Sequence, residues 1–309
     1  MPIASSKSNS STRPLFPRLL IATRPWSFPA ALSPLLITFT IMFLADNLEI
    51  SKAVVFSLSI ISIQGAANLL NSFLDFERGL DRFETAGDRT MVDGLVTRKE
   101  FPFLFFSVAF VWVVSFILSL PFTSWVLYMY LAVYAVGVAL GVMYSAGSRP
   151  LKYMGFGDLT VFLAFGPLLV VAAAWACGKD PSALQIPKII ISTIPASILV
   201  VAILHANNHR DLKVDARHSA NTLAVLMGHQ ISLIYYGTLV LAPSLLSVLL
   251  ALSSVSHAGM AAGGLTFPLG LRLVSVARRK TLPRDIDAET AKLMLLYGIL
   301  TSLGIGLVG

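Results

Sequence analysis

The residues of this chain that could do chemistry lie in two short polar stripes. Asn and Asp recur in each stripe at intervals of three and four residues, which places them on one face of a helix. The first stripe, in NLLNSFLD, and the second, in NHRDLKVD, comprise Asn68, Asn71 and Asp75, and Asn208, Asp211 and Asp215, respectively. Amide and carboxylate oxygens suit Mg²⁺, which commonly uses few protein ligands and completes its shell with substrate phosphates. The stripes therefore predict a site that binds a metal cation and an anionic group together.

Three cations stand beside the stripes within local motifs. They are Arg89 in GDRTMVDG, Lys152 in YSAGSRPLKYMGFGD and Arg210 in NNHRD. Arg binds a diphosphate as a planar fork and Lys binds it as a point charge. The alternative is that these residues are ordinary positive charges at a membrane surface. No motif surrounds four other cations, which we interpret in that plainer way: Arg78, Arg278, Arg279 and Lys280.

Other chemistry is weakly indicated. The sequence contains no phosphate-loop, dinucleotide-binding or zinc-protease motif. His205 and His209 flank the second stripe, and we interpret them as packing residues because Mg²⁺ disfavours imidazole. Cys177 is the only cysteine, which excludes an intrachain disulfide and a cysteine-based zinc cluster. Each stripe taken alone could also be polar side chains that solvate a helix end, an alternative that the match between the two stripes disfavours.

The elements that position these residues must be membrane-spanning helices. The chain has 309 residues, of which 56% are hydrophobic and only 13% charged, and its mean hydropathy is +0.77. A soluble domain carries about twice that share of charge, roughly 25%. Such a surplus of apolar residues cannot be hidden in one water-soluble core and has to face lipid. The composition excludes a disordered protein, a coiled coil and a soluble enzyme.

The hydropathy pattern predicts a nine-helix membrane bundle. A helix needs about 20 apolar residues to cross the hydrocarbon layer. The candidate spans are 25–45, 53–75, 101–120, 124–145, 157–177, 186–206, 230–251, 257–276 and 290–308. Neighbouring helices can satisfy backbone groups that proline frees, so prolines within spans predict kinks in a packed bundle. These prolines are Pro34, Pro167, Pro195, Pro243 and Pro268.

Charge is distributed unequally over the two sides that nine crossings create. Twenty of the 23 Lys and Arg fall on the side of the N-terminus, and Lys52, Lys179 and Lys188 fall on the other. Because cytosolic loops carry an excess of Lys and Arg, this predicts a cytosolic N-terminus. Seven of the sixteen acids lie between spans two and three, on the same side: Asp75, Glu77, Asp81, Glu84, Asp88, Asp93 and Glu100. Asp158, Asp211 and Asp215 face that side too.

Six motifs together resemble the UbiA superfamily of intramembrane aromatic prenyltransferases. In chain order they are RPWSF (24–28), NSFLDFERGLD (71–81), DRTMVD (88–93), YSxG…LK…GD (144–158), NNHRDLKVD (207–215) and TLAVLMG (222–228). The resemblance runs from about residue 22 to 230. RPWSF and DRTMVD are similar to the naphthoquinone branch, in particular to eukaryotic UbiA-domain-containing prenyltransferases that make menaquinone-4. Bacterial 1,4-dihydroxy-2-naphthoate prenyltransferases are the next neighbours.

The resemblance implies an all-α integral membrane protein of UbiA type. We expect a disordered basic tail over 1–22 and, over 23–309, a nine-helix bundle with a central cavity open to the bilayer and cytosolic-side cap loops. The implied reaction is Mg²⁺-dependent transfer of an isoprenyl chain, such as that of geranylgeranyl diphosphate, to a naphthoquinol-type ring in menaquinone (vitamin K2) biosynthesis. The implied partners are the isoprenyl diphosphate, the aromatic quinol and the lipid bilayer; no nucleic acid is expected.

The resemblance also assigns roles to residues. Two Mg²⁺ ions that bridge the diphosphate would be held by Asn71, Asp75, Asp81, Asn208, Asp211 and Asp215. Arg89, Lys152 and Arg210 would bind the diphosphate, and Asn68, Tyr144 and Asp158 would contact substrate in the pocket. Asp75, Asp211, Asp215, Lys152 and Tyr144 are the expected catalytic residues. Many relatives carry acids at the positions of Ser72 and Gly79, whereas here Asp81 lies two residues further on, as in the naphthoquinone branch.

Several alternatives stay open. The acceptor could instead be 1,4-dihydroxy-2-naphthoate, homogentisate, 4-hydroxybenzoate or a haem-type ring. Polar stripes in a helical bundle also occur in secondary transporters, which place them near mid-membrane rather than at one end of the spans. A phospholipid head-group transferase is a further alternative, but the tight acidic motif of that class is missing. The expected location is the endoplasmic reticulum or Golgi membrane in a eukaryote and the plasma membrane otherwise.

Overall fold

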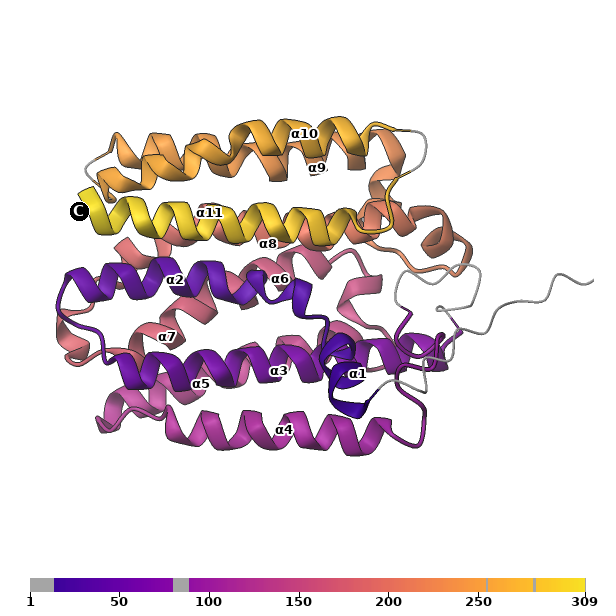
Figure 1. Cartoon of the computed structure of the whole chain (residues 1–309), viewed down its shortest axis with the longest axis horizontal. Coiled ribbons are helices and arrows are strands. Elements are labelled where there is room, and N and C mark those ends of the chain that lie inside the picture. Colours follow the sequence, from indigo (N-terminus) through magenta and orange to yellow (C-terminus); the bar gives the residue numbers. More distant parts are fainter. Residues whose placement is uncertain (1–13, 80–88, 254, 280–281, 309) are drawn as a thin grey trace, which may run out of the picture.

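The computed structural model describes residues 14–79, 89–253, 255–279 and 282–308, and this part of the chain is a bundle of long antiparallel helices (Figure 1). The helices are α1 (Leu15–Ala22), α2 (Pro29–Leu44), α3 (Ile50–Glu77), α4 (Phe101–Leu118), α5 (Ser124–Ser145), α6 (Gly157–Leu163), α7 (Leu169–Cys177), α8 (Ile186–Arg217), α9 (Leu223–Ala251), α10 (Phe267–Ala277) and α11 (Ile286–Val308). Within the described ranges no β-strand occurs, and the protein is an all-α integral membrane protein.

Nine helical segments of the described residues are long and apolar enough to cross a membrane, which confirms the predicted spans. The main difference is at α8, which continues to Arg217, about three turns beyond residue 206, where the predicted span ends. This extension keeps the whole second stripe on one continuous helix. The ends of α3 and α8, α1 and the loops after α5 lie together at one end of the bundle, which we call the cap end, and the C-terminus lies at the other (Figure 1).

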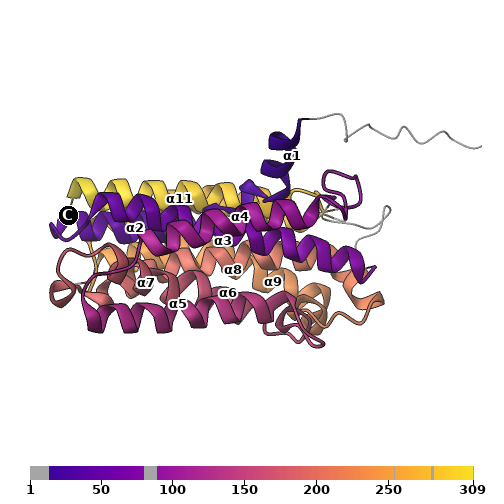
Figure 2. The same cartoon turned by 90° about the horizontal axis from the view of Figure 1, so that it is seen from below.

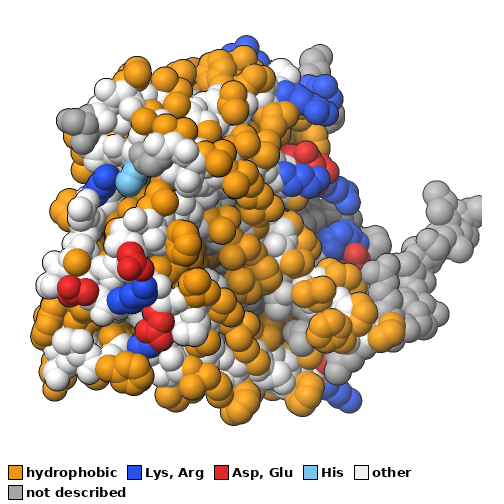
Figure 3. Space-filling model, turned by 60° about the vertical axis from the view of Figure 1, so that its left-hand side comes forward, with side chains coloured by type: hydrophobic (Ala, Val, Ile, Leu, Met, Phe, Trp, Pro, Cys, Tyr) orange, Lys and Arg blue, Asp and Glu red, His pale blue; other side chains and the backbone are white. Residues whose placement is uncertain are grey.

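The middle of the molecule carries the apolar surface that the composition requires. In Figure 3 hydrophobic side chains cover the middle of the face, and charged side chains gather near its two edges. Helix α8 is central, with 67% of its most apolar window buried, whereas only 11% of that window is buried in α4. Phe103, Phe106 and Phe110 of α4 are 65–69% exposed. Helix α4 is therefore a peripheral helix that faces lipid.

Span five is broken in its middle, as its proline predicts. A π-helical segment, Ala164–Leu168, joins α6 to α7, and within it Gly166 has φ −101° and ψ −110°. Pro167 follows, which removes one backbone donor from the helix. A π-bulge of this kind commonly marks a functional site. Here the break carries Phe165 and Leu168 into the wall of the internal cavity described below.

Residues 15–22 differ from the disordered tail that the sequence predicts over 1–22. They form α1, which packs at the cap end (Figure 2). Arg18 Nε donates to the Leu95 carbonyl at 2.8 Å, and its NH2 donates to Glu100 at 2.7 Å. Ala22 is fully buried in a small apolar cluster with Leu69 and neighbours. These long-range contacts order the segment; residues 1–13 lie outside the described part of the chain.

Candidate active site

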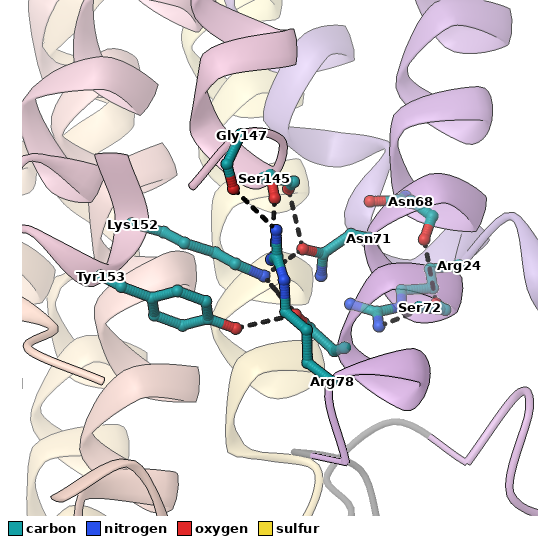
Figure 4. A network of polar contacts seen from close by, with 10 residues as sticks. Arg24, Asn68, Asn71, Ser72, Arg78, Ser145, Gly147, Lys152 and Tyr153 are labelled. Atoms are coloured by element: carbon teal, nitrogen blue, oxygen red, sulfur yellow. Dashed lines mark hydrogen bonds and ion pairs between the residues drawn. The ribbon is translucent and has the colours of Figure 1, made fainter. Parts of the chain in front are cut away.

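The first stripe lies on the last turns of α3 and meets the short 3-10 turn Leu151–Tyr153 (Figure 4). The Lys152 ammonium donates to both carboxylate oxygens of Asp75, at 2.9 and 2.8 Å, and also to the Asn71 side-chain oxygen. The Tyr153 hydroxyl donates to Asp75 at 2.7 Å, and Ser145 Oγ donates to Asn71 at 2.8 Å. The end of α5 and the turn that follows it, both distant in sequence from α3, therefore converge on two residues of the stripe.

Lys152 is a buried cation, with only 7% of its surface exposed. Burial lowers the pKa of Lys152, the Asp75 carboxylate opposes this shift, and the positive charges of Arg24 and Arg78 lower the pKa further. Three cations thus act on one small volume. Such an arrangement favours an anionic ligand, since a diphosphate would relieve the repulsion among them.

The two stripes face the same volume. Burial raises the pKa of the Tyr153 phenol, and the carboxylates of Asp75 and then of Asp215 raise it further. Asp75 stands near the end of α3 and Asp215 near the end of α8, so both helix ends act on the same phenol. Asp215 also lies 3.5 Å from the Thr222 hydroxyl, which caps α9. Both stripes therefore place a carboxylate near Tyr153, and their joint binding of metal ions stays a prediction.

Asp211 of the second stripe is held by an arginine. Arg210 Nε and NH2 donate to the two Asp211 oxygens at 2.9 and 2.7 Å. The same guanidinium contacts Asn207, the Arg284 carbonyl and Asp287 of α11 at 2.6, 2.6 and 3.1 Å. Asn208 is buried beside them. Arg210 is therefore an organising residue of the second stripe in this structure, and its predicted contact with a diphosphate stays a prediction.

The remaining predicted residues are placed as follows. Arg89 NH2 pairs with Asp93 at 2.5 Å in the loop before α4, and Asp81 lies outside the described residues. Tyr144 lines the cavity. Asp158 is 4% exposed and its Oδ2 lies 3.1 Å from His205 Nδ1. Neither residue of this pair is among those that line the cavity, so the predicted contact of Asp158 with substrate differs from its place in the structure, where it joins α6 to α8.

Both histidines are buried, as their interpretation as packing residues predicts. His205 Nε2 lies 2.9 Å from the Ser232 hydroxyl, and His209 Nδ1 lies 2.7 Å from the same oxygen. They join α8 to α9, and the ring of His229 stacks on that of His209 with centroids 5.0 Å apart. The side of α8 opposite the cavity is thereby fixed.

A cavity of about 640 Å³ begins beside the first stripe. Its polar end is lined by Arg24, Gln64, Asn68, Asn71, Asn207 and Asp287. The rest of the wall is mostly apolar and comes from α3, α4, α5, the π-helical segment and α8. A space that is polar at one end and apolar over its length suits a molecule with a charged head and a hydrocarbon tail.

Arg24 is a residue of this site that the sequence argument did not assign. Its backbone is left-handed, with φ 55°, which is uncommon for a residue other than glycine. Its NH2 donates to Ser72 Oγ at 3.1 Å, while Asn68 Nδ2 donates to the Thr23 carbonyl at 2.8 Å and to Ser27 at 3.0 Å. Asn68 therefore anchors the segment that carries Arg24. Arg24 is the first residue of the RPWSF motif, and this motif is the sequence signal that could have identified it as a site residue.

The oxygen-bearing side chains of the two stripes are suited to magnesium. Among the described residues no three His, Cys, Asp or Glu side chains gather into a ready-made metal site. Mg²⁺ does not require one, since it is held by one or two carboxylates together with substrate phosphates. The side-chain oxygen of Asn71, which lines the cavity, and the neighbouring Asp75 carboxylate offer hard ligands. In this structure the Lys152 ammonium binds both of them and neutralises the carboxylate. The residues present fit a cation that arrives with an anionic substrate.

Comparisons with known proteins identify the family of the chain. The model of the UbiA prenyltransferase family matches residues 32–299. The chain belongs to the UbiA prenyltransferase family. It is 32% identical over 295 residues to UbiA prenyltransferase domain-containing protein 1 of Xenopus tropicalis, covering 93% of this chain and 81% of that protein. It is thus a membrane-embedded prenyltransferase, and the family assignment predicted from the motifs is confirmed.

Solved structures show the same UbiA fold. An apo UbiA homolog from Aeropyrum pernix K1 superposes with a TM-score of 0.63 at 18% identity, over 95% of this chain and 98% of that chain. A UbiA homolog from Archaeoglobus fulgidus bound to GPP and Mg²⁺ superposes with a TM-score of 0.59 at 15% identity, over 94% of this chain and 100% of that one. The predicted nine-helix UbiA-type bundle is confirmed.

Proposed function

We propose that this enzyme transfers an isoprenyl chain from an allylic diphosphate to a naphthoquinol-type ring, with Mg²⁺, in menaquinone biosynthesis. The observation that carries the proposal is the buried Lys152, which donates to Asp75 of the first stripe and to Asn71, a residue that lines the apolar cavity. The Archaeoglobus fulgidus homolog, which is bound to GPP and Mg²⁺, supports the donor class and the metal. The DRTMVD and RPWSF motifs support the naphthoquinol acceptor.

The cap end of the cavity would bind the diphosphate. Arg24 lines this end and Lys152 binds Asn71, which also lines it, so both cations would neutralise phosphate oxygens there. When bound, Mg²⁺ would supply Lewis-acid stabilisation of the charge that grows on the departing diphosphate. Asp75 with Asn71, and Asp211 with Asp215 and Asn208, would hold the two metal ions. The ammonium of Lys152 would then turn from Asp75 toward the diphosphate, a change of partner within one buried cluster.

The apolar part of the cavity would hold the isoprenyl tail and the acceptor ring. Departure of diphosphate from an allylic carbon leaves a delocalised cation, and the faces of Tyr144 and Phe165 line the space that it would occupy. Fixed charges act strongly in such a water-poor space. Holding the electron-rich ring beside the allylic carbon removes much of the entropic barrier to bond formation. The ring then loses a proton to restore aromaticity.

We also propose that the cap end faces the cytosol. Twenty of the 23 Lys and Arg belong to this side of the predicted topology, and cytosolic loops carry such an excess. In a eukaryotic cell the enzyme would reside in the endoplasmic reticulum or Golgi membrane. A tag at the N-terminus that stays protected from protease in sealed microsomes, whose cytosolic face points outward, would contradict this orientation.

The test is a reconstituted assay. The protein in liposomes receives geranylgeranyl diphosphate, Mg²⁺ and, in parallel, a reduced naphthoquinone, 1,4-dihydroxy-2-naphthoate, homogentisate or 4-hydroxybenzoate, and products are identified by mass. We expect a prenylated naphthoquinol together with released diphosphate, and no product after EDTA. Transfer activity should return when Mg²⁺ is added back. Turnover in EDTA would refute the metal proposal, and prenylation of a different ring would identify that ring as the acceptor instead.

Replacing Lys152 by alanine should raise the KM for the diphosphate donor by about ten- to a hundredfold, because a charge-assisted hydrogen bond contributes about 1.5–3 kcal/mol. The KM for the aromatic acceptor should change little. Lys179→Ala is the matched control, since Lys179 pairs with Asp46 on an exposed surface. Steady-state kinetics with each substrate varied in turn measure the split. A larger effect on the acceptor would assign Lys152 to ring recognition instead.

A further inference from the structure

The end of the cavity farthest from the cap is closed by aromatic side chains. Trp112 of α4 and Tyr134 of α5 line it there. Trp112 Nε1 donates to the Tyr134 hydroxyl at 2.8 Å, and Ser59 Oγ of α3 lies 2.9 Å from the same oxygen. Three helices are joined at this point. We call Trp112 and Tyr134, which Ser59 helps to hold in place, the aromatic floor.

The protein behind the aromatic floor is closely packed. The Phe116 ring lies 4.5 Å from that of Tyr134, and the Tyr130 ring lies 5.5 Å from it. Tyr130 and Phe56 are fully buried, and the Tyr130 hydroxyl lies 3.0 Å from Ser119 Oγ. A hydrocarbon chain cannot pass this cluster unless several interlocked rings move, because close-packed interiors resist such displacement.

The depth of the cavity follows from the helices that line it. On α3, Asn71 at the polar end and Ile60 at the aromatic floor are separated by eleven residues, about 16 Å at the helical rise. On α5, Tyr144 and Tyr134 give about 15 Å in the same way. One isoprene unit adds four chain bonds of ~1.5 Å, which span about 5 Å along the axis of an extended zigzag chain. The depth therefore accommodates about three isoprene units in an extended tail, and a fourth when the tail is partly folded.

We propose that the aromatic floor sets the length of the isoprenyl tail that the enzyme accepts. The inference rests on the proposed function, since it concerns the donor of that reaction. Farnesyl and geranylgeranyl diphosphates fill the cavity from the phosphate end to the aromatic floor. A longer tail has to bend sideways between α4 and α5. Removing the Trp112 ring lengthens the space, and filling the cavity above Tyr134 shortens it.

The first test is Trp112→Ala. Relative kcat/KM is measured for geranyl, farnesyl, geranylgeranyl and the five-unit geranylfarnesyl diphosphate. We expect the five-unit donor to gain about tenfold over geranylgeranyl diphosphate, in the range by which hydrophobic pockets discriminate chain length. Trp125→Ala is the matched control, because Trp125 is 53% exposed on the same helix hairpin and does not line the cavity. An active Trp112→Ala enzyme with the wild-type profile overturns the inference.

The second test adds volume in place of removing it, and stands alone if Trp112→Ala fails to fold. A Cβ built on Gly137 meets no atom within 4 Å, so a larger side chain has room there. Gly137 lies one helical turn above Tyr134, about 4.5 Å nearer the polar end. Gly137→Leu should therefore shift preference toward donors one unit shorter. The control is Val136→Leu, at an exposed position outside the cavity wall; an unchanged profile in Gly137→Leu overturns the inference.

The failure of this inference and that of the proposed function give different results. A wild-type protein that transfers no isoprenyl chain to any ring refutes the proposed function, and the inference with it. An active wild type whose donor profile is insensitive to both cavity variants refutes the inference alone. That outcome would mean that the tail leaves the cavity sideways before it reaches the aromatic floor.

Discussion

Asp75→Ala should abolish prenyl transfer while the protein still inserts into membranes and purifies as a folded helical protein. The Asp75 carboxylate accepts hydrogen bonds from Lys152 and Tyr153 in the structure, and it would ligate a metal ion in the reaction. Loss of several kcal/mol of metal-derived stabilisation corresponds to about a thousandfold or more in rate, at about 1.4 kcal/mol per tenfold. Single-turnover assays with saturating donor and Mg²⁺ measure this loss.

Two further variants show whether the loss comes from the negative charge. Asp75→Asn keeps an acceptor oxygen for Tyr153 but removes the charge, and we expect it to be as inactive as Asp75→Ala. Glu77→Ala is the matched control on the same helix end, because Glu77 pairs with Arg98 on an exposed surface; its activity should stay close to that of the wild type. Substantial turnover by either Asp75 variant would refute the metal assignment of the first stripe.

Asp211→Ala should cause a loss of similar size by acting on the second stripe. The Asp211 carboxylate accepts hydrogen bonds from Nε and NH2 of Arg210, and we propose it as a metal ligand. Arg210 keeps its contacts with Asn207, the Arg284 carbonyl and Asp287 after the substitution. The fold should therefore survive, and activity should fall about a thousandfold with little change in Tm.

The matched control for this prediction is Asp46→Ala. Asp46 lies at the opposite end of the bundle, where it forms an ion pair with the exposed Lys179. Both variants are assayed for donor consumption, product formation and thermal unfolding in the same lipid. An active Asp211→Ala enzyme would show that the second stripe serves structure rather than catalysis. A collapse of Tm in step with activity would lead to the same conclusion.

Much of the fold was predictable because lipid imposes a simple requirement on sequence. All nine spans are confirmed, since a run of apolar residues long enough to cross the bilayer has few alternative structures. The predicted sixth span ends at 206, whereas α8 continues to Arg217. A hydropathy pattern stops where polar residues begin, although the helix itself can continue beyond that point. Helix α1 was missed because the contacts of Arg18 with distant residues order it.

The candidate site was predictable in its composition and less so in its contacts. The stripes follow from spacing along single helices, which is local information. The approach of Lys152 and Tyr153 to Asp75 depends on how the loop after α5 folds back over α3, which no spacing encodes. For the same reason Arg24 and Asp287 were not assigned, although one stands in the RPWSF motif and the other in the first turn of the last span.

The bond between Arg210 and Asp287 has a consequence for biosynthesis of the enzyme. Asp287 belongs to α11, which follows α8 in the chain and leaves the ribosome after it, yet it contacts the arginine that organises Asp211 on α8. A nascent chain that has inserted α8 but not α11 lacks this clamp. The order of synthesis therefore delays completion of the second stripe until α11 has been made.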